Sequence, residues 1–333
     1  MNTRVFFWLN IFMLQFLGAQ NIPETPAVSQ VVFVAYGDVN LGRKVGQQIL
    51  RGDIDYPFKK INFADDSADI LFVNLESQLS NQHGETQHPK NNLIFTGPLE
   101  GAAALKNAGI KIVSTANNHM FDYGKKALLE TMANLDSAGI LYIGTAHQRK
   151  DLYHPLIVEE NNIKFAIFAV TDLMNFERGW QENVAFCDTT LLFAAIDSVR
   201  SFVDAIIVSY HGGGEYLDTP AYRTRKIAEK CAAHGVMLFL GHHPHVSYGI
   251  NKIQESYIVA SLGNFVFYQP QKYWTQRAYG VKFIFEKTIE GTAVHFEKIL
   301  PITASFQPKR MSDSTEIRKL FIRTQNLSNI LIQ

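Results

Sequence analysis

The 333-residue sequence contains only two cysteines, Cys187 and Cys231. Two thiolates are too few for the cysteine cage of a structural zinc site, so any metal ligands must be nitrogen and oxygen atoms. An oxidising compartment would permit a disulfide between the two cysteines, but their spacing alone does not establish one.

The sequence also lacks an excess of either charge, because 31 Lys and Arg residues balance 31 Asp and Glu residues. A balanced charge argues against a nucleic-acid binder, which usually carries a basic excess. The sequence has no glycine-rich phosphate loop either, since the glycines at 212–214 are not followed by Lys and Ser or Thr. We therefore expect neither nucleic acid as a partner nor a P-loop nucleotide site.

After residue 20, no segment is apolar for long enough to span a bilayer. The apolar stretch at 5–17 follows Arg4 and precedes the small residues Gly18 and Ala19, which is typical of a secretory signal. We therefore expect residues 1–20 to be a signal peptide and the mature chain to be exported, to the periplasm or the extracellular space. An uncleaved segment that retains the protein at the membrane is the alternative.

Hydrophobic periodicity predicts alternating strands and helices over the rest of the chain. Buried strands are expected at 31–36, 70–74, 112–115, 205–210 and 236–240, and amphipathic helices at 124–138 and 221–234. Hairpins at 156–170 and 281–300 add antiparallel strands to this α/β order. We expect one domain over residues 30–305, followed by a helical tail at 306–333.

Polar residues with metal-binding side chains follow the predicted strands. They are Asp38 and Asn40; Asn74 and Glu76; Asn117, Asn118 and His119; His211 and Glu215; His242, His243 and His245; and Asn264. Carboxylates, amides and imidazoles together suit borderline divalent metals such as Mn, Fe or Zn, bound as one ion or two. Each residue has an ordinary alternative use, because Asp and Asn at strand-to-helix turns commonly cap helices. Taken together, their repeated position at strand ends favours a metal site.

The same blocks resemble a known family. They are Gly37-Asp38, Asn74-Leu75-Glu76, Asn117-Asn118-His119 with Asp122-Tyr123-Gly124, His211 with Glu215-Tyr216, Gly241-His242-His243-Pro244-His245, and Ser261-Leu262-Gly263-Asn264-Phe265. In unbroken order over about 31–267, they look like the CapA family of bacterial capsule and poly-γ-glutamate synthesis proteins. That family in turn resembles the calcineurin-like metallophosphoesterases.

The resemblance implies a four-layer α/β/β/α sandwich of the metallophosphoesterase type, with a metal site at the sheet edges. The metal ligands that it implies are Asp38, Glu76, Asn118, His211, His243 and His245. His119 would be the catalytic acid or phosphate-contacting residue, and His242 is the alternative to His243 as a ligand. Further residues of the implied site are Asn40, Asn74, Asn117, Glu215 and Asn264.

Two residues depart from the pattern of the wider phosphoesterases. Asn40 stands where those enzymes have a histidine, and Glu76 stands where they bridge the metals with aspartate. An amide is a weaker ligand than imidazole, so we expect unequal metal sites if Asn40 binds a metal. The alternative is that the Asn40 side chain caps the following segment.

The function expected from the residues and the resemblance is that of an exported, metal-dependent hydrolase of capsule or poly-γ-glutamate synthesis. Its substrate would be an anionic polymer or a phosphoester, cleaved at a phosphoester bond or at a γ-glutamyl or related amide bond. The alternative is a non-catalytic component that binds polymer, or that assembles with membrane-bound polymer synthesis proteins.

Overall fold

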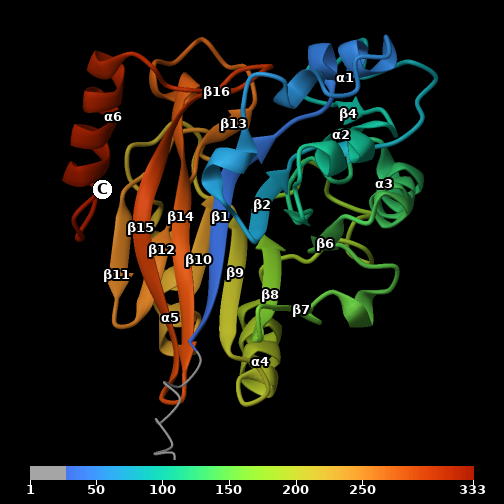
Figure 1. Cartoon of the computed structure of the whole chain (residues 1–333). Coiled ribbons are helices and arrows are strands. Elements are labelled where there is room, and N and C mark those ends of the chain that lie inside the picture. Colours follow the sequence, from blue (N-terminus) through green and yellow to red (C-terminus); the bar gives the residue numbers. More distant parts are fainter. Residues whose placement is uncertain (1–27) are drawn as a thin grey trace, which may run out of the picture.

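The computed structural model describes residues 28–333, which form two large β-sheets flanked by helices (Figure 1). The signal peptide predicted at 1–20 lies outside the described residues. Within 28–333, no helix combines the length and the apolar character needed to cross a membrane.

The first sheet is mixed. Its order is β16 (Lys309–Arg310), β15 (Gly291–Thr303), β14 (Arg277–Thr288), β1 (Ser29–Val39), β2 (Ile70–Leu75), β5 (Ile112–Ser114) and β6 (Leu141–Ile143), and β13 (Asn264–Val266) also pairs with β1. The strands β1, β2, β5 and β6 are parallel, whereas β14 and β15 form the antiparallel hairpin expected from the sequence.

The second sheet has the same mixed character. Its order is β11 (Ile250–Ile253), β12 (Ser256–Val259), β10 (Leu238–His242), β9 (Ala205–His211), β8 (Ile163–Thr171) and β7 (Leu156–Glu160). The four inner strands are parallel, and β7 and β11 close the two edges as antiparallel hairpins. A separate pair of short strands consists of β3 (Gln78–Leu79) and β4 (Thr96–Gly97).

The first five helices cover the outer faces of the two sheets, and the last helix packs at one edge. They are α1 (Arg43–Leu50), α2 (Gly101–Asn107), α3 (Gly124–Ala138), α4 (Thr189–Val199), α5 (Tyr222–Ala233) and α6 (Ser314–Asn326), with 3-10 turns at Tyr56–Phe58, Phe63–Asp66, Arg149–Asp151 and Trp274–Gln276.

Side chains alternate between two cores along β1. Phe33 packs in the same cluster as Ile207 of β9, between the sheets, whereas Val34 packs with Leu105 of α2 and Leu135 of α3. A third core lies on the far side of the second sheet, against α4 and α5. Because successive side chains of a strand point to opposite faces, central strands such as β2 in the first sheet and β9 and β10 in the second are buried on both sides. The four-layer α/β/β/α sandwich predicted above is therefore confirmed.

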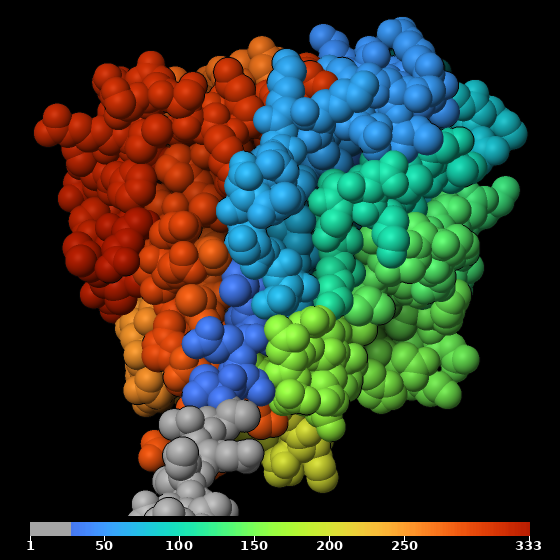
Figure 2. Space-filling model, in the orientation of Figure 1, coloured from blue at the N-terminus to red at the C-terminus, as the bar shows by residue number. Residues whose placement is uncertain are grey.

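The C-terminal tail closes one edge of the sandwich. The backbone amide of Ile250 in β11 donates to Ser328 Oγ at 2.8 Å, and that of Ile299 in β15 donates to the Gln333 carbonyl oxygen at 2.8 Å. Leu320 of α6 is buried in the core between the sheets. Figure 2 shows the red C-terminal segment lying against the orange β14–β15 hairpin. The tail beyond residue 305 is thus packed onto both sheets.

Most of the predicted strands and helices are present, although some bounds, such as the C-terminal end of β1, differ by three residues or more. The strands expected at 31–36, 70–74 and 112–115 are β1, β2 and β5, and the helix expected at 124–138 is α3. Cys187 and Cys231 are both buried and are not joined to each other.

Candidate metal centre

The candidate centre lies where parallel strands of the two sheets end. In the first sheet, Asp38 of β1 is paired with Asn74 of β2, and Glu76 follows β2 directly. In the second sheet, β9 and β10 end at the paired residues His211 and His242. Ligand sites of open α/β sheets form at the carboxyl ends of the strands, because side chains from neighbouring strands meet there.

Two glycines allow unusually close backbone approach at this place. A Cβ atom at position 37 would lie 1.7 Å from the carbonyl oxygen of Gly263, and one at position 241 would lie 2.0 Å from that of Ala260. Neither position has room for a side chain, so Gly37 and Gly241 are required by packing. These contacts fix the backbone immediately before Asp38 and before the histidine cluster, residues 242–245.

Asp38, Glu76 and His211 form the middle of the site. One ligand atom from each lies within 4.8 Å of the others, and all three residues are fully buried. Charged groups are almost never fully buried without a partner of opposite charge or a metal. Two carboxylates and an imidazole at this spacing are therefore suited to hold a divalent cation.

The Asn74 amide links the members of this triad. Its Nδ2 donates to Asp38 Oδ1 at 2.9 Å and to Glu76 Oε2 at 3.3 Å, and it lies 3.3 Å from His211 Nδ1. Asn117 Nδ2 in turn donates to Asn74 Oδ1 at 3.2 Å, which fixes the orientation of the Asn74 amide. Asn74 and Asn117 therefore position the triad.

Several buried atoms of the site have no hydrogen-bond partner among the described residues. They are Glu76 Oε1, His243 Nδ1 and both ring nitrogens of His242. Buried polar groups are normally satisfied, and leaving one unpaired costs about 1–3 kcal/mol. Four such atoms around one triad indicate that the site is built for an additional group.

The histidine cluster has a strained backbone. His243 and His245 have φ angles of +96° and +59°, a region that residues other than glycine rarely occupy. Such conformations concentrate at functional sites. They leave His242 Nδ1 3.4 Å from Asp38 Oδ1 and His245 Nδ1 3.5 Å from Asp38 Oδ2. His245 Nδ1 also lies 2.9 Å from Asn264 Oδ1, so Asn264 orients this ring.

Asn118 lies beside the triad on the loop after β5. Its Oδ1 is 2.8 Å from His211 Nε2, and its Nδ2 donates to Asn175 Oδ1 at 2.9 Å. The amide oxygen therefore faces the site, as the resemblance implies for a ligand. Asn175 was not identified from the sequence, because it lies in an irregular segment between β8 and α4 with no motif around it.

His119 is held by an acidic partner. Its Nδ1 lies 2.8 Å from Asp122 Oδ2, and its Nε2 lies 3.8 Å from Glu76 Oε1. Asp122 also accepts hydrogen bonds from the Phe95 amide at 3.0 Å and from Asn175 Nδ2 at 3.3 Å. A carboxylate on Nδ1 fixes the ring so that Nε2 points at the triad. The sequence placed Asp122 in a motif but gave it no role.

Asn40 and Glu215 are placed differently from the other predicted residues. Asn40 Oδ1 accepts a hydrogen bond from the Gly42 amide at 2.8 Å, which is the capping use given above as the alternative. Glu215 is exposed on the loop after β9, although its charge still acts on Glu76. Neither residue supplies an atom to the triad.

The two carboxylates have opposite pKa shifts. Burial and the neighbouring charge of Asp38 raise the pKa of Glu76 well above its usual value of 4.5. Burial opposes ionisation of Asp38 as well, but His242 and His245 outweigh it and hold the pKa of Asp38 well below its usual value. The pKa values of the two carboxyls are thus pushed apart, as expected for two acids that share one site.

Two of the buried histidines, His211 and His243, favour the neutral form. Burial and the nearby His243 lower the pKa of His211 well below its usual value. Burial and His245 lower the pKa of His243 to about 3. Neutral imidazole is the form that binds metals, so both rings are ready to act as ligands at neutral pH.

The residues present fit a divalent metal. Asp38, Glu76 and His211 would hold it, with Asn118 Oδ1 and the rings of the histidine cluster as further ligands. The unpartnered atoms Glu76 Oε1 and His243 Nδ1 would gain a partner in this way. The combination of carboxylate, amide and imidazole matches borderline metals.

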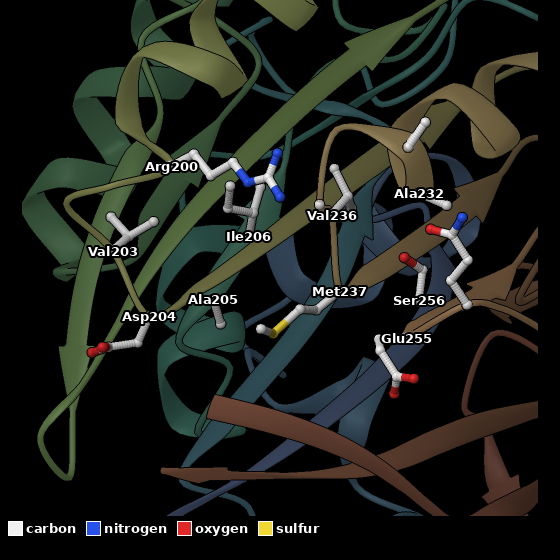
Figure 3. Close-up of a pocket in the computed structure, with 13 residues that line it drawn as sticks. Arg200, Val203, Asp204, Ala205, Ile206, Ala232, Val236, Met237, Glu255 and Ser256 are labelled. Carbon is white, nitrogen blue, oxygen red and sulfur yellow. The ribbon is translucent and has the colours of Figure 1, made fainter. Parts of the chain in front are cut away.

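A hollow of about 370 Å³ lies at the opposite end of the second sheet (Figure 3). It is lined by Arg200, Asp204, Met237 and Glu255 among others. These residues lie near the amino ends of the strands, away from His211. Asp204 already pairs with Lys287 at 2.8 Å. The buried ligand groups without a partner are therefore gathered at the carboxyl ends of the strands, in the candidate metal centre.

The fold and the site define a class: an α/β/β/α sandwich with carboxylate, amide and imidazole groups gathered at strand ends between its sheets. The sequence profile of the family described as "Bacterial capsule synthesis protein PGA_cap" matches residues 32–269, more than half of the chain. The chain belongs to this family, and the resemblance noted from its motifs is confirmed.

Two curated relatives carry related descriptions. "Capsule biosynthesis protein CapA" of Bacillus anthracis is 28% identical over 268 residues, which are 78% of this chain and 64% of the relative. "PGA biosynthesis protein CapA" of Bacillus subtilis (strain 168) is 26% identical over 272 residues, which are 80% of this chain and 70% of the relative. The chain thus spans less than two thirds of the first relative.

Two solved structures are similar to this chain, each with a TM-score below 0.5. A 5'-nucleotidase from Candida albicans SC5314 has a TM-score of 0.44 and 12% identity, covering 81% of this chain and 51% of that one. A Staphylococcus aureus protein described as a 5'-nucleotidase, in complex with alpha-ketoglutarate, has a TM-score of 0.47 and 11% identity, covering 89% of this chain and 58% of that one.

Proposed function

We propose that the protein is an exported, metal-dependent hydrolase that acts on an anionic surface polymer or its precursors. The bond cleaved is a phosphoester or a γ-glutamyl or related amide bond. The observation that carries this proposal is the buried triad of Asp38, Glu76 and His211, surrounded by imidazole and carboxylate atoms that have no partner.

Different side chains have different roles in the proposed reaction. When bound, a divalent metal supplies a water of lowered pKa and polarises the oxygen that it contacts. Asp38, Glu76 and His211 hold that site in a buried environment, where charges interact strongly. His119, oriented by Asp122, presents Nε2 to the same space and can deliver a proton to the leaving group.

The substrate class is supported by the family. Its description names capsule synthesis, and the relative from Bacillus subtilis is named for PGA biosynthesis. A surface polymer lies outside the cytoplasmic membrane, in agreement with the signal peptide predicted at 1–20. Assembly with membrane-bound synthesis proteins is part of the same proposal.

A second function, polymer binding without catalysis, is favoured by one observation. Asn74 Nδ2 lies within 3.3 Å of Asp38, Glu76 and His211, so the triad is partly satisfied by an internal hydrogen-bond donor. A polar network of this kind can stabilise a fold without holding metal.

Reconstitution separates the two functions. The purified protein is stripped with a chelator, dialysed, and assayed on a chromogenic phosphodiester and on poly-γ-glutamate with Mn, Fe or Zn added singly. The hydrolase predicts cleavage of one substrate that depends on metal and is lost in Glu76→Ala. Polymer binding that persists in the metal-free protein, without cleavage under any condition, would refute the hydrolase and support polymer binding without catalysis.

A further inference from the structure

Arg43 is the first residue of α1 and has a backbone φ of +53°. This left-handed conformation is rare for a long side chain and costs conformational free energy. Thr86 holds it in place, because the Arg43 amide donates to the Thr86 carbonyl at 2.8 Å and Thr86 Oγ1 donates to the Arg43 carbonyl at 2.8 Å. The fold therefore maintains a strained backbone that fixes the direction of this side chain.

The guanidinium of Arg43 lies between two aromatic rings. Its Cζ is 4.4 Å from the centre of the Phe95 ring and 5.8 Å from that of Phe267. The Phe95 ring stacks on His119 at 4.2 Å, and the Phe267 ring lies 4.9 Å from that of His245. Arg43 is thus connected through one ring on each side to histidines of the candidate metal centre.

The hydrogen-bonding capacity of Arg43 is largely unused. Nη2 donates to the Asn92 carbonyl at 2.7 Å, but the buried Nε has no partner. Among residues 28–333, no carboxylate lies within ion-pair distance of this guanidinium, although Glu76 and Asp122 act on it from further away. An arginine carries five donors in a fork that matches an oxyanion. Arg43 therefore has free donors and no direct ion-pair partner among the described residues.

A hollow of about 250 Å³ opens beside Arg43. Its lining includes Asn40, Lys44, Gln87 and Tyr268, so two cations and several polar groups face it. Its volume is several times the share of about 30 Å³ that one water has in the liquid. Phe267 also lines this hollow, and its ring lies 4.9 Å from that of His245, so a group bound there would lie beside the histidine cluster.

We propose that Arg43 determines substrate specificity by binding a carboxylate of the polymer repeat that adjoins the bond placed at the metal centre. This inference rests on the function proposed above. It narrows the substrate to a polyanion that carries an acidic group next to the bond that is cleaved. Arg43 is held rigid by Phe95 and Phe267, so little side-chain entropy is lost on binding. Lys44 adds charge to the same hollow.

Calorimetry with defined probes tests this assignment. The probes are a γ-linked glutamate trimer, the same trimer with its α-carboxylates converted to amides, and inorganic phosphate. The proteins are the metal-loaded wild type, Arg43→Gln, Arg43→Lys and Arg51→Gln, the last removing an exposed cation at the other end of α1. Elemental analysis and thermal midpoints verify that each variant is folded and equally loaded.

The wild type should bind the acidic trimer more tightly than the amide trimer. Arg43→Gln should weaken binding of the acidic trimer on the order of 10- to 100-fold and abolish the preference, as expected for a charged hydrogen bond. Arg43→Lys should retain part of the affinity, and Arg51→Gln should match the wild type.

Three results overturn the inference: equal binding of both trimers by the wild type, unchanged affinity in Arg43→Gln, or a loss confined to inorganic phosphate. In the last case Arg43 would contact the reacting phosphoryl group instead. If binding depends on Arg43 but no substrate is hydrolysed, the specificity assignment stands and the hydrolase fails. If metal-dependent hydrolysis is found while Arg43→Gln binds normally, the hydrolase stands and the specificity role of Arg43 fails.

Discussion

Replacing Asp122 by asparagine removes one buried negative charge beside His119 while leaving the side-chain volume almost unchanged. Asp122 is buried, and its Oδ2 lies 2.8 Å from His119 Nδ1. In Asp122→Asn, one of the donors that now meet the carboxylate, from His119, Phe95 or Asn175, would face an amide NH₂ group instead. The asparagine therefore stabilises a protonated His119 ring less than the aspartate does.

The size of the effect follows from the bond that is lost. A hydrogen bond to a charged group contributes about 1.5–3 kcal/mol. At about 1.4 kcal/mol per factor of ten, turnover should fall about 10- to 150-fold. Because Asp122 contacts none of the triad residues, we expect metal content to stay at the wild-type level.

The assay is steady-state hydrolysis by metal-saturated protein, with metal content measured on the same samples. Asp151→Asn is a matched control, because Asp151 pairs with His154 at 3.4 Å with the same three-residue spacing on an exposed surface. Unchanged turnover in Asp122→Asn would refute the role given to the His119–Asp122 pair. A parallel loss of metal would show that Asp122 acts on the ligands instead.

Three further predictions concern individual residues. His119→Ala should keep its metal and lose turnover by about 10²- to 10⁴-fold, whereas loss of metal in step with activity would make His119 a ligand. Asn40→His should lower the free energy of unfolding by about 1 kcal/mol without raising the metal-to-protein ratio after dialysis, because it removes the cap on Gly42; a higher ratio would instead identify position 40 as a ligand site. Burial raises the pKa of Glu76, so this carboxyl keeps its proton to higher pH in the folded metal-free protein than an unfolded glutamate does. Metal binding requires the carboxylate form, so below the raised pKa it should release protons, measured by calorimetry in buffers of different ionisation enthalpy, and Glu76→Gln should release fewer.

The elements that could be predicted from the sequence are those whose secondary structure is determined by a local hydrophobic pattern. The apolar run at 31–36 predicted a buried strand, and the segment at 124–138 predicted an amphipathic helix with one apolar face; both are confirmed, as β1 and α3. The convergence of Asp38, Glu76 and His211 was predictable because all three lie at carboxyl ends of parallel strands.

Other features depend on contacts between distant segments. Arg43 begins α1 in a left-handed conformation that only the pairing with Thr86 stabilises, so no local signal indicated the helix start. Asn175 contacts Asn118 and Asp122 from an irregular segment. The sequence allowed Asn40 to be a ligand or a cap, and the hydrogen bond that its side chain accepts from the Gly42 amide depends on the backbone path of this loop.

The central claim is that the buried triad holds a metal, and metal content tests it most directly. Wild-type protein, Glu76→Ala, His211→Ala and the control His234→Ala, which alters a histidine paired with Asp197 outside the site, are dialysed and analysed for Mn, Fe and Zn. We predict at least one bound ion per chain in the wild type and the control, and strongly reduced content in both triad variants. Wild-type protein that retains no metal after loading, or equal metal content in all four proteins, would contradict the claim.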